Sequence, residues 1–420
     1  MKRVLFLITL FFVTSRAGGV LQCVAAEPRF SVVFDGKEGK YEVVRTPQLL
    51  VTKAGTLLAF AQGRSGAHDR SDNDIILKRS ADGGGTWSKF QVIADEGKDS
   101  LNSICVVQLR DTGRILVIGC RFPDGYEMRD FQYLSPGLQE YQKTAGRDKI
   151  PAIQPGYDGP GVERNYIIHS DDDGRTWSPL RDITREVKRP APDISCVPGP
   201  GVAIQLSEGP HRGRIVVPCN TRWLETGKSK AAYRNLPYAI FSDDGGQTWQ
   251  RGELAPDGKT AREQYGDETQ MVELPGGAIL LNTRASGRNI ATSRDGGQTW
   301  SALSDEPAIP TTPTAAGFIR YSGLGDGTKS RLLFSNPTEV GRNHGVISLS
   351  YDDGKTWPVQ ETLRAGRFKY SALARLSDGS IGCIFDGTVG KGEFENHTGA
   401  AILLARFTLE WLTKGMDHLP

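Results

Sequence analysis

The sequence predicts an all-β fold, a six-bladed β-propeller built from four-stranded antiparallel blades. Three observations lead to this prediction. The chain of 420 residues contains 50 Gly and 23 Pro, well above the roughly 12% of an average protein, which indicates many tight turns. An octapeptide that ends in Trp recurs five times, and short apolar hairpins recur six times along the chain. Repeats of this spacing are typical of propellers, in which a single closed domain reaches this length.

The composition excludes several classes of protein. Lys and Arg number 51 and Asp and Glu 49, so the formal net charge is +2, without the strongly basic character of nucleic-acid-binding proteins. A hydrophobic content of 38% argues against disorder. A mean hydropathy of −0.37 argues against several membrane spans. We therefore expect no nucleic-acid partner and no membrane span.

Residues 1–26 are predicted to be a secretory signal peptide. Lys2 and Arg3 precede an apolar run at 4–13, and small residues up to Ala26 offer a cleavage site, which is the pattern of such a signal. The run is too short to cross a bilayer. Cys23 raises a lipoprotein signal as an alternative, but Gln22 stands where that signal needs a small residue. We expect export to the periplasm or the medium, with residues 27–420 as one catalytic domain.

The octapeptide has the residues of a tight turn between two strands. In the pattern S-x-D-x-G-x-T-W, the Asp can accept backbone N–H bonds, the Gly supplies a positive φ, and Thr-Trp begins the next strand. The copies are Ser80 to Trp87, Ser170 to Trp177, Ser242 to Trp249, Ser293 to Trp300, and Ser350 to Trp357.

The apolar hairpins complete a four-stranded unit. A Gly-containing turn precedes each short apolar strand, and an apolar run precedes most of these turns, as expected of a hairpin. A third strand then runs into the octapeptide, which joins it to the fourth. Pairing of residues 30–34 with residues 402–412 would close the ring and remove exposed sheet edges. The strands after the turns are at 57–58, 115–117, 215–217, 279–281, 332–334 and 381–384.

This strand order places a set of polar residues on the rim opposite the octapeptides. The first strands line the central channel, so their starts and the ends of the second strands converge there. Charged loop residues at such a place are candidates for function, although surface loops are often charged. The set is Arg45, Arg64, Asp69, Glu268, Arg284, Arg342, Tyr370 and Asp386.

The octapeptides and these positions together resemble the bacterial exo-α-sialidases (neuraminidases), whose repeats are called Asp boxes or BNR repeats. The resemblance covers about Arg45 to Leu412. Arg45-Thr46-Pro47 resembles the family's Arg-Ile-Pro motif, and Asp69 lies five residues before Asp74, as the family's acid/base Asp precedes a second Asp. The other matches are Asp267 to Leu274 with Glu268, Leu281 to Arg284, Phe334 to Pro337 followed by Arg342, and Tyr370-Ser371.

The resemblance implies an exo-α-sialidase that releases terminal sialic acid from glycoconjugates with retention, without cofactor or metal. Arg45, Arg284 and Arg342 would bind the sugar carboxylate through charge-assisted bonds. That carboxylate would repel an Asp or Glu nucleophile, so the neutral Tyr370 is suited to the attack. Glu268 would take the phenolic proton, and Asp69 would act as general acid and base.

Two supporting positions complete the implied site. Arg64 resembles a residue that contacts a ring hydroxyl. Asp386 stands where the family usually has Glu to hold the first Arg, and Thr46 stands where it has Ile. The shorter Asp386 requires either a closer approach of its strand or a less tightly held Arg45.

Other interpretations stay open at this point. A hydrolase of a related 2-keto-3-deoxy sugar acid would use the same three Arg residues, and a propeller that binds sialic acid without cleaving it would need no Tyr, Glu and Asp together. A purely structural propeller has no need for three Arg on one rim. We expect sialylated glycans as the only partners and a monomeric protein.

Further predictions concern one long stretch, one Trp and two pairs of Cys. The long stretch 121–164 is expected to shape the pocket around the sugar's amide and glycerol groups, or else to be a surface insertion. Trp223 is a candidate for stacking on a sugar or for packing. Cys105 and Cys120, and likewise Cys196 and Cys219, flank predicted hairpins, so each pair is either a disulfide or two buried thiols.

Overall fold

The computed structural model describes residues 26–128, 136–225, 232–259, 266–325, 327–394 and 397–419. The predicted signal peptide lies outside these ranges except for Ala26. Within them the chain is all-β, as predicted, and none of the helices is long and apolar enough to cross a membrane. The helical segments are α1 (Pro136–Thr144), α2 (Thr184–Val187), the 3-10 turn η2 (Pro275–Gly277) and α3 (Leu409–Leu412).

The first two strand groups are antiparallel meanders. In each group the strands pair in chain order, and an octapeptide joins the third strand to the fourth, as the sequence predicted. The first group is β2 (Val43–Val51), β3 (Leu57–Arg64), β4 (Asn73–Ser80) and β5 (Gln91–Ala94). The second is β6 (Ser100–Gln108), β7 (Ile115–Phe122), β8 (Arg164–Ser170) and β9 (Arg181–Asp182).

The third group has a broken inner strand, which the sequence did not predict. Its pieces are interrupted around Pro198, Gly199 and Pro200, because a Pro has no N–H to donate to a ladder and Gly199 has a positive φ of 48°. The middle piece pairs instead with β6, through Gly201 and Cys105. The strands are β10 (Val197–Pro198), β11 (Gly201–Val202), β12 (Ile204–Gln205), β13 (Ile215–Glu225), β14 (Ala232–Ser242) and β15 (Gln250–Arg251).

The remaining strand groups bring the end of the chain next to its beginning. The long strand β23 belongs to two groups, since its first half pairs with β22 and its second half with β24. The predicted pairing of the chain ends is present, with Val32 opposite Leu403. The strands are β16 (Thr269–Glu273), β17 (Ile279–Arg284), β18 (Arg288–Ser293), β19 (Ser304–Asp305), β20 (Gly317–Ser322), β21 (Arg331–Glu339), β22 (Asn343–Ser350), β23 (Val359–Arg375), β24 (Ile381–Phe394), β25 (His397–Phe407) and β1 (Arg29–Asp35).

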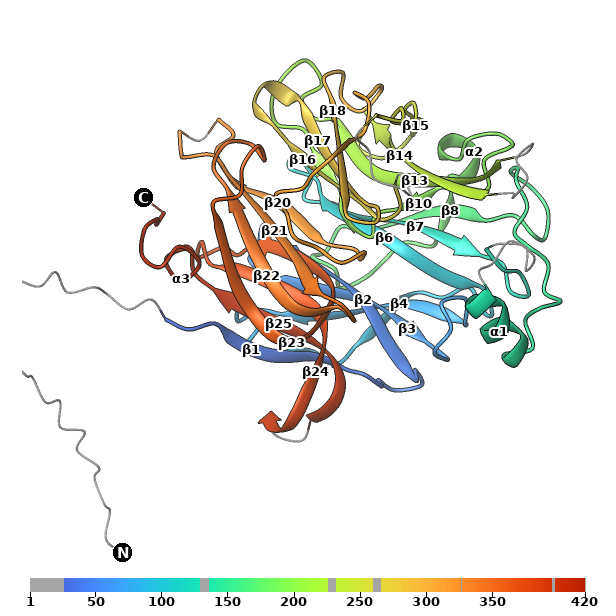
Figure 1. Cartoon of the computed structure of the whole chain (residues 1–420), viewed down its shortest axis with the longest axis horizontal. Coiled ribbons are helices and arrows are strands. Elements are labelled where there is room, and N and C mark those ends of the chain that lie inside the picture. Colours follow the sequence, from blue (N-terminus) through green and yellow to red (C-terminus); the bar gives the residue numbers. More distant parts are fainter. Residues whose placement is uncertain are drawn as a thin grey trace, which may run out of the picture.

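The strand groups follow one another around the molecule in chain order, and the C-terminal strands lie beside β1 and β2 (Figure 1). The inner strand β2 contacts β6 and β23, and β16 contacts β13 and β20. Apolar side chains fill the spaces between neighbouring groups. For example, Leu58 and Phe60 of one group pack with Val106 and Val117 of the next. The core is therefore a series of clusters around a polar centre.

Each octapeptide forms the predicted turn, with its Asp as the main acceptor. In the first copy the Thr86 backbone N–H and hydroxyl donate to the Asp82 carboxylate at 2.9 and 2.7 Å, and Gly84 N donates to Ser80 Oγ at 2.9 Å. Gly84 has a φ of 92°, which a residue with a Cβ rarely adopts. The other four copies repeat these bonds.

The cysteines of the described residues are buried thiols and form no disulfide. Cys105 lies opposite Ile118 and Cys120 opposite Asn102 across the β6–β7 hairpin, so the two are not cross-strand partners. Among the described residues, the four cysteines of the two predicted pairs are free thiols.

Candidate functional site

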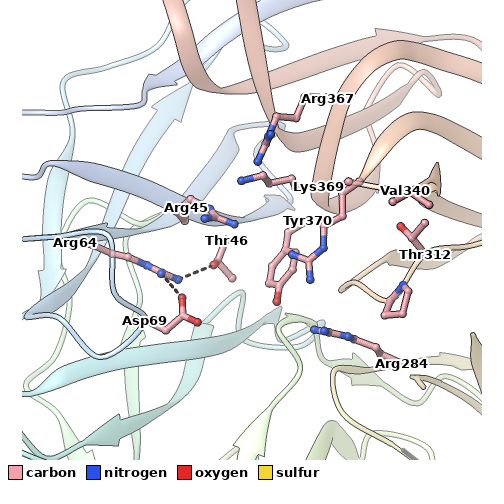
Figure 2. Close-up of a pocket in the computed structure, with 13 residues that line it drawn as sticks. Arg45, Thr46, Arg64, Asp69, Arg284, Thr312, Val340, Arg367, Lys369 and Tyr370 are labelled. Atoms are coloured by element: carbon pink, nitrogen blue, oxygen red, sulfur yellow. Dashed lines mark hydrogen bonds and ion pairs between the residues drawn. The ribbon is translucent and has the colours of Figure 1, made fainter. Parts of the chain in front are cut away.

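The eight predicted site residues converge at one end of the inner strands. Most of them lie inside strands rather than in front of them, because the strands extend further toward the rim than predicted. A cavity of about 680 Å³, here called the main cavity, is lined by six of the eight (Figure 2). These are Arg45 in β2, Arg64 at the end of β3, Asp69 in the following loop, Arg284 at the end of β17, Arg342 between β21 and β22, and Tyr370 in β23.

The other two predicted residues lie directly behind this lining. Glu268 precedes β16 and accepts a hydrogen bond from the Tyr370 hydroxyl at its Oε1. Its Oε2 pairs with Arg284 Nη1 at 2.7 Å. Burial and the Glu268 charge raise the pKa of Tyr370, while the guanidinium groups of Arg284 and Arg342 act in the opposite direction. The phenol is thus neutral, with a carboxylate placed to accept its proton.

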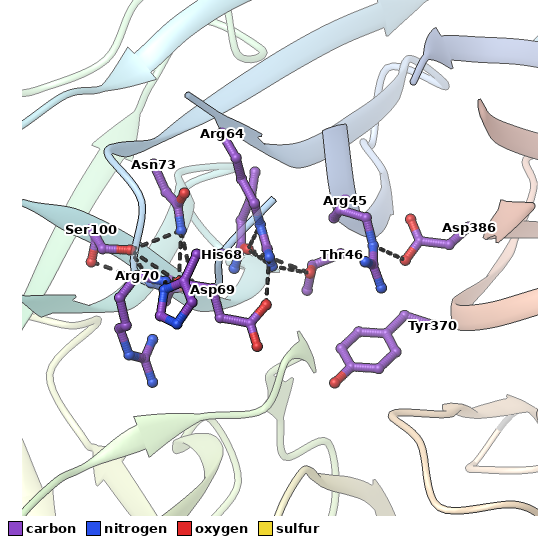
Figure 3. Close-up of polar contacts among 12 residues, drawn as sticks. Arg45, Thr46, Arg64, His68, Asp69, Arg70, Asn73, Ser100, Tyr370 and Asp386 are labelled. Carbon is purple, nitrogen blue, oxygen red and sulfur yellow. Dashed lines mark hydrogen bonds and ion pairs between the residues drawn. The ribbon is translucent and has the colours of Figure 1, made fainter. Parts of the chain in front are cut away.

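Asp386 in β24 pairs with Arg45, with 3.3 Å between Asp386 Oδ2 and Arg45 Nε (Figure 3). Asp386 is only 4% exposed, and its charge raises the pKa of Arg45. The shorter Asp side chain therefore still reaches the guanidinium, because β24 runs close to β2. Arg45 points toward the same cavity as Tyr370.

Arg342 enters the cavity from a tight turn. It has a positive φ of 62°, and its backbone N–H donates to the Glu339 carbonyl at 3.1 Å. Its guanidinium carbon lies 5.3 Å from the centroid of the Tyr370 ring. This conformation is strained for a residue with a side chain, and it directs a positive charge to the face of the phenol.

Asp69 is held by a single charged partner. Arg64 Nη1 contacts Asp69 Oδ1 at 2.5 Å, and Arg64 is itself fixed by Gln62 Oε1 at 2.6 Å from Nη2. The Asp69 side chain is 77% exposed. Desolvation opposes ionisation, but the neighbouring Arg64 holds the pKa of Asp69 below its ordinary value. The Asp69 carbonyl also accepts a bond from Asn73 Nδ2 at 3.0 Å, which fixes the loop.

A second, smaller space adjoins the main cavity. This side cavity of about 190 Å³ shares Arg64, Asp69 and Tyr370 with it and adds Met128 and Arg70. Met128 belongs to the long stretch 121–164, so part of that stretch does line the site. Tyr133 and the Trp223 side chain lie outside the described part.

Arg70 in the side cavity was not singled out from the sequence. Its guanidinium carbon lies 3.5 Å from the centroid of the Phe122 ring. Its Nε is buried without a hydrogen-bond partner among the described residues, and burial lowers the pKa of this group. The only sequence signal is its position next to Asp69, in a loop already assigned to the rim.

Arg367 and Lys369 also line the main cavity and were not predicted. Alternation along β23 would put Lys369 and Tyr370 on opposite faces. The register shifts between Phe368 and Ser371, so both side chains reach the cavity. Burial and the charges of Arg45 and Arg367 lower the pKa of Lys369 to about 8.

None of the described residues forms a cluster of His, Cys, Asp and Glu that could hold a metal ion. The side chains of the site offer a phenol with a carboxylate acceptor, an exposed carboxylic acid, and a concentration of guanidinium groups.

The chain is similar to one family of domains and to several known sialidases. The model of the BNR repeat-like domain matches residues 55–383. A sialidase of Micromonospora viridifaciens is 31% identical over 389 residues, which is 90% of this chain and 53% of that protein. A sialidase of Bacteroides fragilis is 27% identical over 375 residues, 84% of this chain and 61% of that protein. The chain thus spans little more than half of these relatives.

Solved structures show the same fold. The intramolecular trans-sialidase from Ruminococcus gnavus, in complex with oseltamivir carboxylate, superimposes with a TM-score of 0.67 at 21% identity, covering 91% of this chain and 98% of that chain. The leech intramolecular trans-sialidase complexed with 2,7-anhydro-Neu5Ac gives a TM-score of 0.70 at 22% identity, covering 91% of this chain and 70% of that chain.

Proposed function

Because the chain belongs to the sialidase family with BNR repeats, we propose that it is an exo-α-sialidase that hydrolyses terminal α-linked sialic acid from glycoproteins, glycolipids or oligosaccharides with retention of configuration. The observation that carries this proposal is the contact of Tyr370 with Glu268 in a cavity that also contains Asp69 and three convergent Arg residues. A binding protein would need the Arg residues but not an activated phenol.

The first step is recognition of the sugar carboxylate. Arg45, Arg284 and Arg342 approach the cavity from three different strand groups, so they can surround a carboxylate. Arg is suited to this role because its planar guanidinium forms paired, charge-assisted bonds. The pairs with Asp386 and Glu268 fix the orientation of Arg45 and Arg284 before substrate arrives.

The second step forms a covalent intermediate. The Tyr370 oxygen attacks the anomeric carbon, its proton passes to Glu268, and Asp69 protonates the departing glycosidic oxygen. Water then attacks the same carbon, gives its proton to Asp69, and releases Tyr370, which regains its proton from Glu268. Two displacements give net retention. The substrate carboxylate repels an anionic nucleophile, which favours a phenol over an Asp or Glu.

We also propose that residues 27–420 form one six-bladed propeller and that residues 1–26 direct export. The antiparallel meanders, their order around the molecule and the pairing of β1 with β25 support a closed ring. A ring of this kind brings residues from distant parts of the chain to one central site.

A second candidate is a hydrolase of a related 2-keto-3-deoxy sugar acid, and Arg70 is the observation that favours testing it. The carboxylate and the anomeric carbon are common to both substrates, so the main cavity does not distinguish them. The side cavity lies beyond Asp69, and its cationic lining by Arg70 would suit a substituent rich in oxygen.

Hydrolysis of fluorogenic glycosides tests both candidates. We expect the wild type to hydrolyse a 4-methylumbelliferyl sialoside and the Tyr370→Phe variant to lose most of this activity. Tyr141→Phe, which changes a 53% exposed tyrosine on α1, is the matched control. Wild-type hydrolysis of a 5-hydroxy analogue alone would favour the second candidate. No hydrolysis of any such glycoside would refute the enzyme proposal.

A further inference from the structure

The positive charges of the main cavity are only partly balanced by the protein. Arg45 pairs with Asp386 at 3.3 Å, Arg64 with Asp69 at 2.5 Å, and Arg284 with Glu268 at 2.7 Å. Each of these pairs joins a cavity cation to a carboxylate of a neighbouring strand or loop. Within these three pairs the positive and negative charges cancel, so the pairs contribute no net positive charge to the cavity.

Three further cations of the same cavity have no such partner. Within the described part of the chain, Arg342, Arg367 and Lys369 form no ion pair, although all three line the cavity. Like charges gathered without counter-charges cost free energy in the unliganded protein. A single sugar carboxylate supplies one negative charge, so two cations stay unbalanced after a mono-anionic substrate has bound.

The groups around Lys369 show this excess of positive charge. The charged groups that face it are Arg45 from β2, Arg342 from the β21–β22 turn, Asp386 from β24, and Arg367 from its own strand. Three of these four are cations, and together with burial they lower the pKa of Lys369 to about 8. Lys369 is half-buried, so solvent screens its charge incompletely.

A second negative charge on the substrate has to lie on the leaving group, because the sialic acid unit itself carries only one carboxylate. The carboxylate and the glycosidic oxygen of a sialoside are attached to the same carbon, so the next sugar leaves the cavity beside the carboxylate. Figure 2 shows Arg367 and Lys369 next to Arg45 and on the opposite side of it from Asp69. A leaving-group sugar held at Asp69 by its glycosidic oxygen therefore meets these two cations where it extends across the carboxylate-binding Arg residues.

The cavity has room for such a group. Its volume of about 680 Å³ lies in the upper half of the roughly 300–1,000 Å³ range of small-molecule sites. Val340 at its edge is an apolar side chain that is 91% exposed. An exposed apolar residue beside two cations offers the contacts that a charged sugar needs, since a sugar ring has both apolar and polar faces.

We propose that Arg367 and Lys369 form a second anion subsite, which binds a carboxylate or a sulfate ester on the leaving-group sugar. This inference rests on the proposed sialidase function and specifies its substrate class: sialosides whose aglycone is itself anionic. Both anions offer the planar or tetrahedral oxygen acceptors that guanidinium and ammonium groups bind.

Three sialosides with related leaving groups test the proposal. They are a sialyl-lactose, the same compound sulfated on galactose, and a disialyl-lactose, which carries a second sialic acid carboxylate. At low ionic strength we expect the kcat/KM of at least one anionic substrate to exceed that of sialyl-lactose by roughly tenfold, mainly through KM. The preference should decline with added salt and as the pH rises through about 8.

The double variant Arg367→Gln/Lys369→Gln should process all three compounds about equally well. The ratio of kcat/KM for a substrate with an anionic leaving group to kcat/KM for sialyl-lactose should then be close to one. Lys355→Gln removes an exposed charge from the last octapeptide, on the other face, and should leave this ratio as in the wild type. A wild-type ratio near one, or a high ratio that survives the double substitution, would overturn the subsite. A preference for the sulfated compound alone assigns a sulfate ester to the subsite, and a preference for disialyl-lactose alone assigns a carboxylate.

Binding measurements separate failure of this subsite from failure of the enzyme proposal. Calorimetry on the Tyr370→Phe variant gives the Kd of each compound without turnover. If the wild type hydrolyses none of the compounds, the enzyme proposal is refuted, but a Kd ratio of roughly ten that depends on Arg367 and Lys369 still supports the subsite. Equal Kd values for all three compounds overturn it.

Discussion

Tyr370 and Glu268 lie 102 positions apart in the sequence and are joined by a hydrogen bond from the phenol to the carboxylate. The second oxygen of Glu268 is occupied by Arg284 at 2.7 Å, so only one oxygen is directed at the phenol. Burial keeps the pKa of Tyr370 above its ordinary value in the free protein. In the proposed mechanism the phenol therefore loses its proton to Glu268 during attack, and not by ionisation beforehand.

Asp386 is predicted to act through Arg45. Asp386→Asn removes the charge that orients the guanidinium, and loss of one partner of a buried pair costs about 2–5 kcal/mol. We expect KM to rise by at least roughly tenfold, with a smaller change in kcat. Asp111→Asn, at an exposed position, should change neither value. An unchanged KM in Asp386→Asn would show that Arg45 needs no fixed partner.

Arg64 is predicted to set the pH dependence of the acid step. Asp69 must be protonated to donate to the leaving oxygen, and Arg64 holds its pKa below the ordinary value. Arg64→Met removes this effect, so the alkaline limb of the kcat/KM profile should move to higher pH by about one unit. The exposed Arg212→Met is the control. A limb that stays in place would argue against Asp69 as the acid.

We predict that Arg70 lowers the stability of the protein and raises its activity. Its charge has no ion-pair partner among the described residues, and replacing such a group with an apolar one is often neutral or stabilising. For Arg70→Met we expect the free energy of unfolding to rise by about 1 kcal/mol, while kcat/KM falls. Denaturant titration and steady-state kinetics measure the two. A variant that loses stability and keeps its activity would contradict this prediction.

The octapeptide carboxylates are predicted to make stability depend on pH in the acid range. Hydrogen bonds from Thr176 lower the pKa of Asp172 to about 2, against about 3.9 in an unfolded chain. The folded pKa is the lower one, so the stabilisation is present above about 3.9 and is lost as the pH falls through about 2. Asp172→Asn should lower Tm at pH 7 and have little effect near pH 2. An equal loss at both values would contradict this account.

The sequence predicted the turns and the convergence of the eight residues, because the first depends on local chemistry and the second on a regular strand order. The octapeptide specifies its own bonds through Asp, Gly and Thr, so five copies mark five turns without tertiary information. The eight residues come together because a regular meander directs the rim-facing parts of its strands, and the loops between them, to one side. The all-β class follows from the same regularity.

The parts that the sequence did not predict depend on local irregularity or on distant packing. Lys369 enters the cavity only because the pairing of β23 shifts in register beside Tyr370. The inner strand of the third group is broken at Pro198 and Pro200, and one piece pairs with β6 instead. Arg70 packs against the ring of Phe122, which is 52 positions away, so no pattern near Arg70 indicates this contact.

The central claim is that Tyr370 is the nucleophile, and covalent trapping tests it most directly. A 3-fluorinated sialosyl fluoride slows release of the sugar from the enzyme, so the intermediate accumulates and peptide mass spectrometry can locate it. We predict that the sugar is attached to the peptide containing Tyr370, and that attachment is abolished in Tyr370→Phe. Inactivation with the label on any other residue, or full turnover by Tyr370→Phe, would contradict the account.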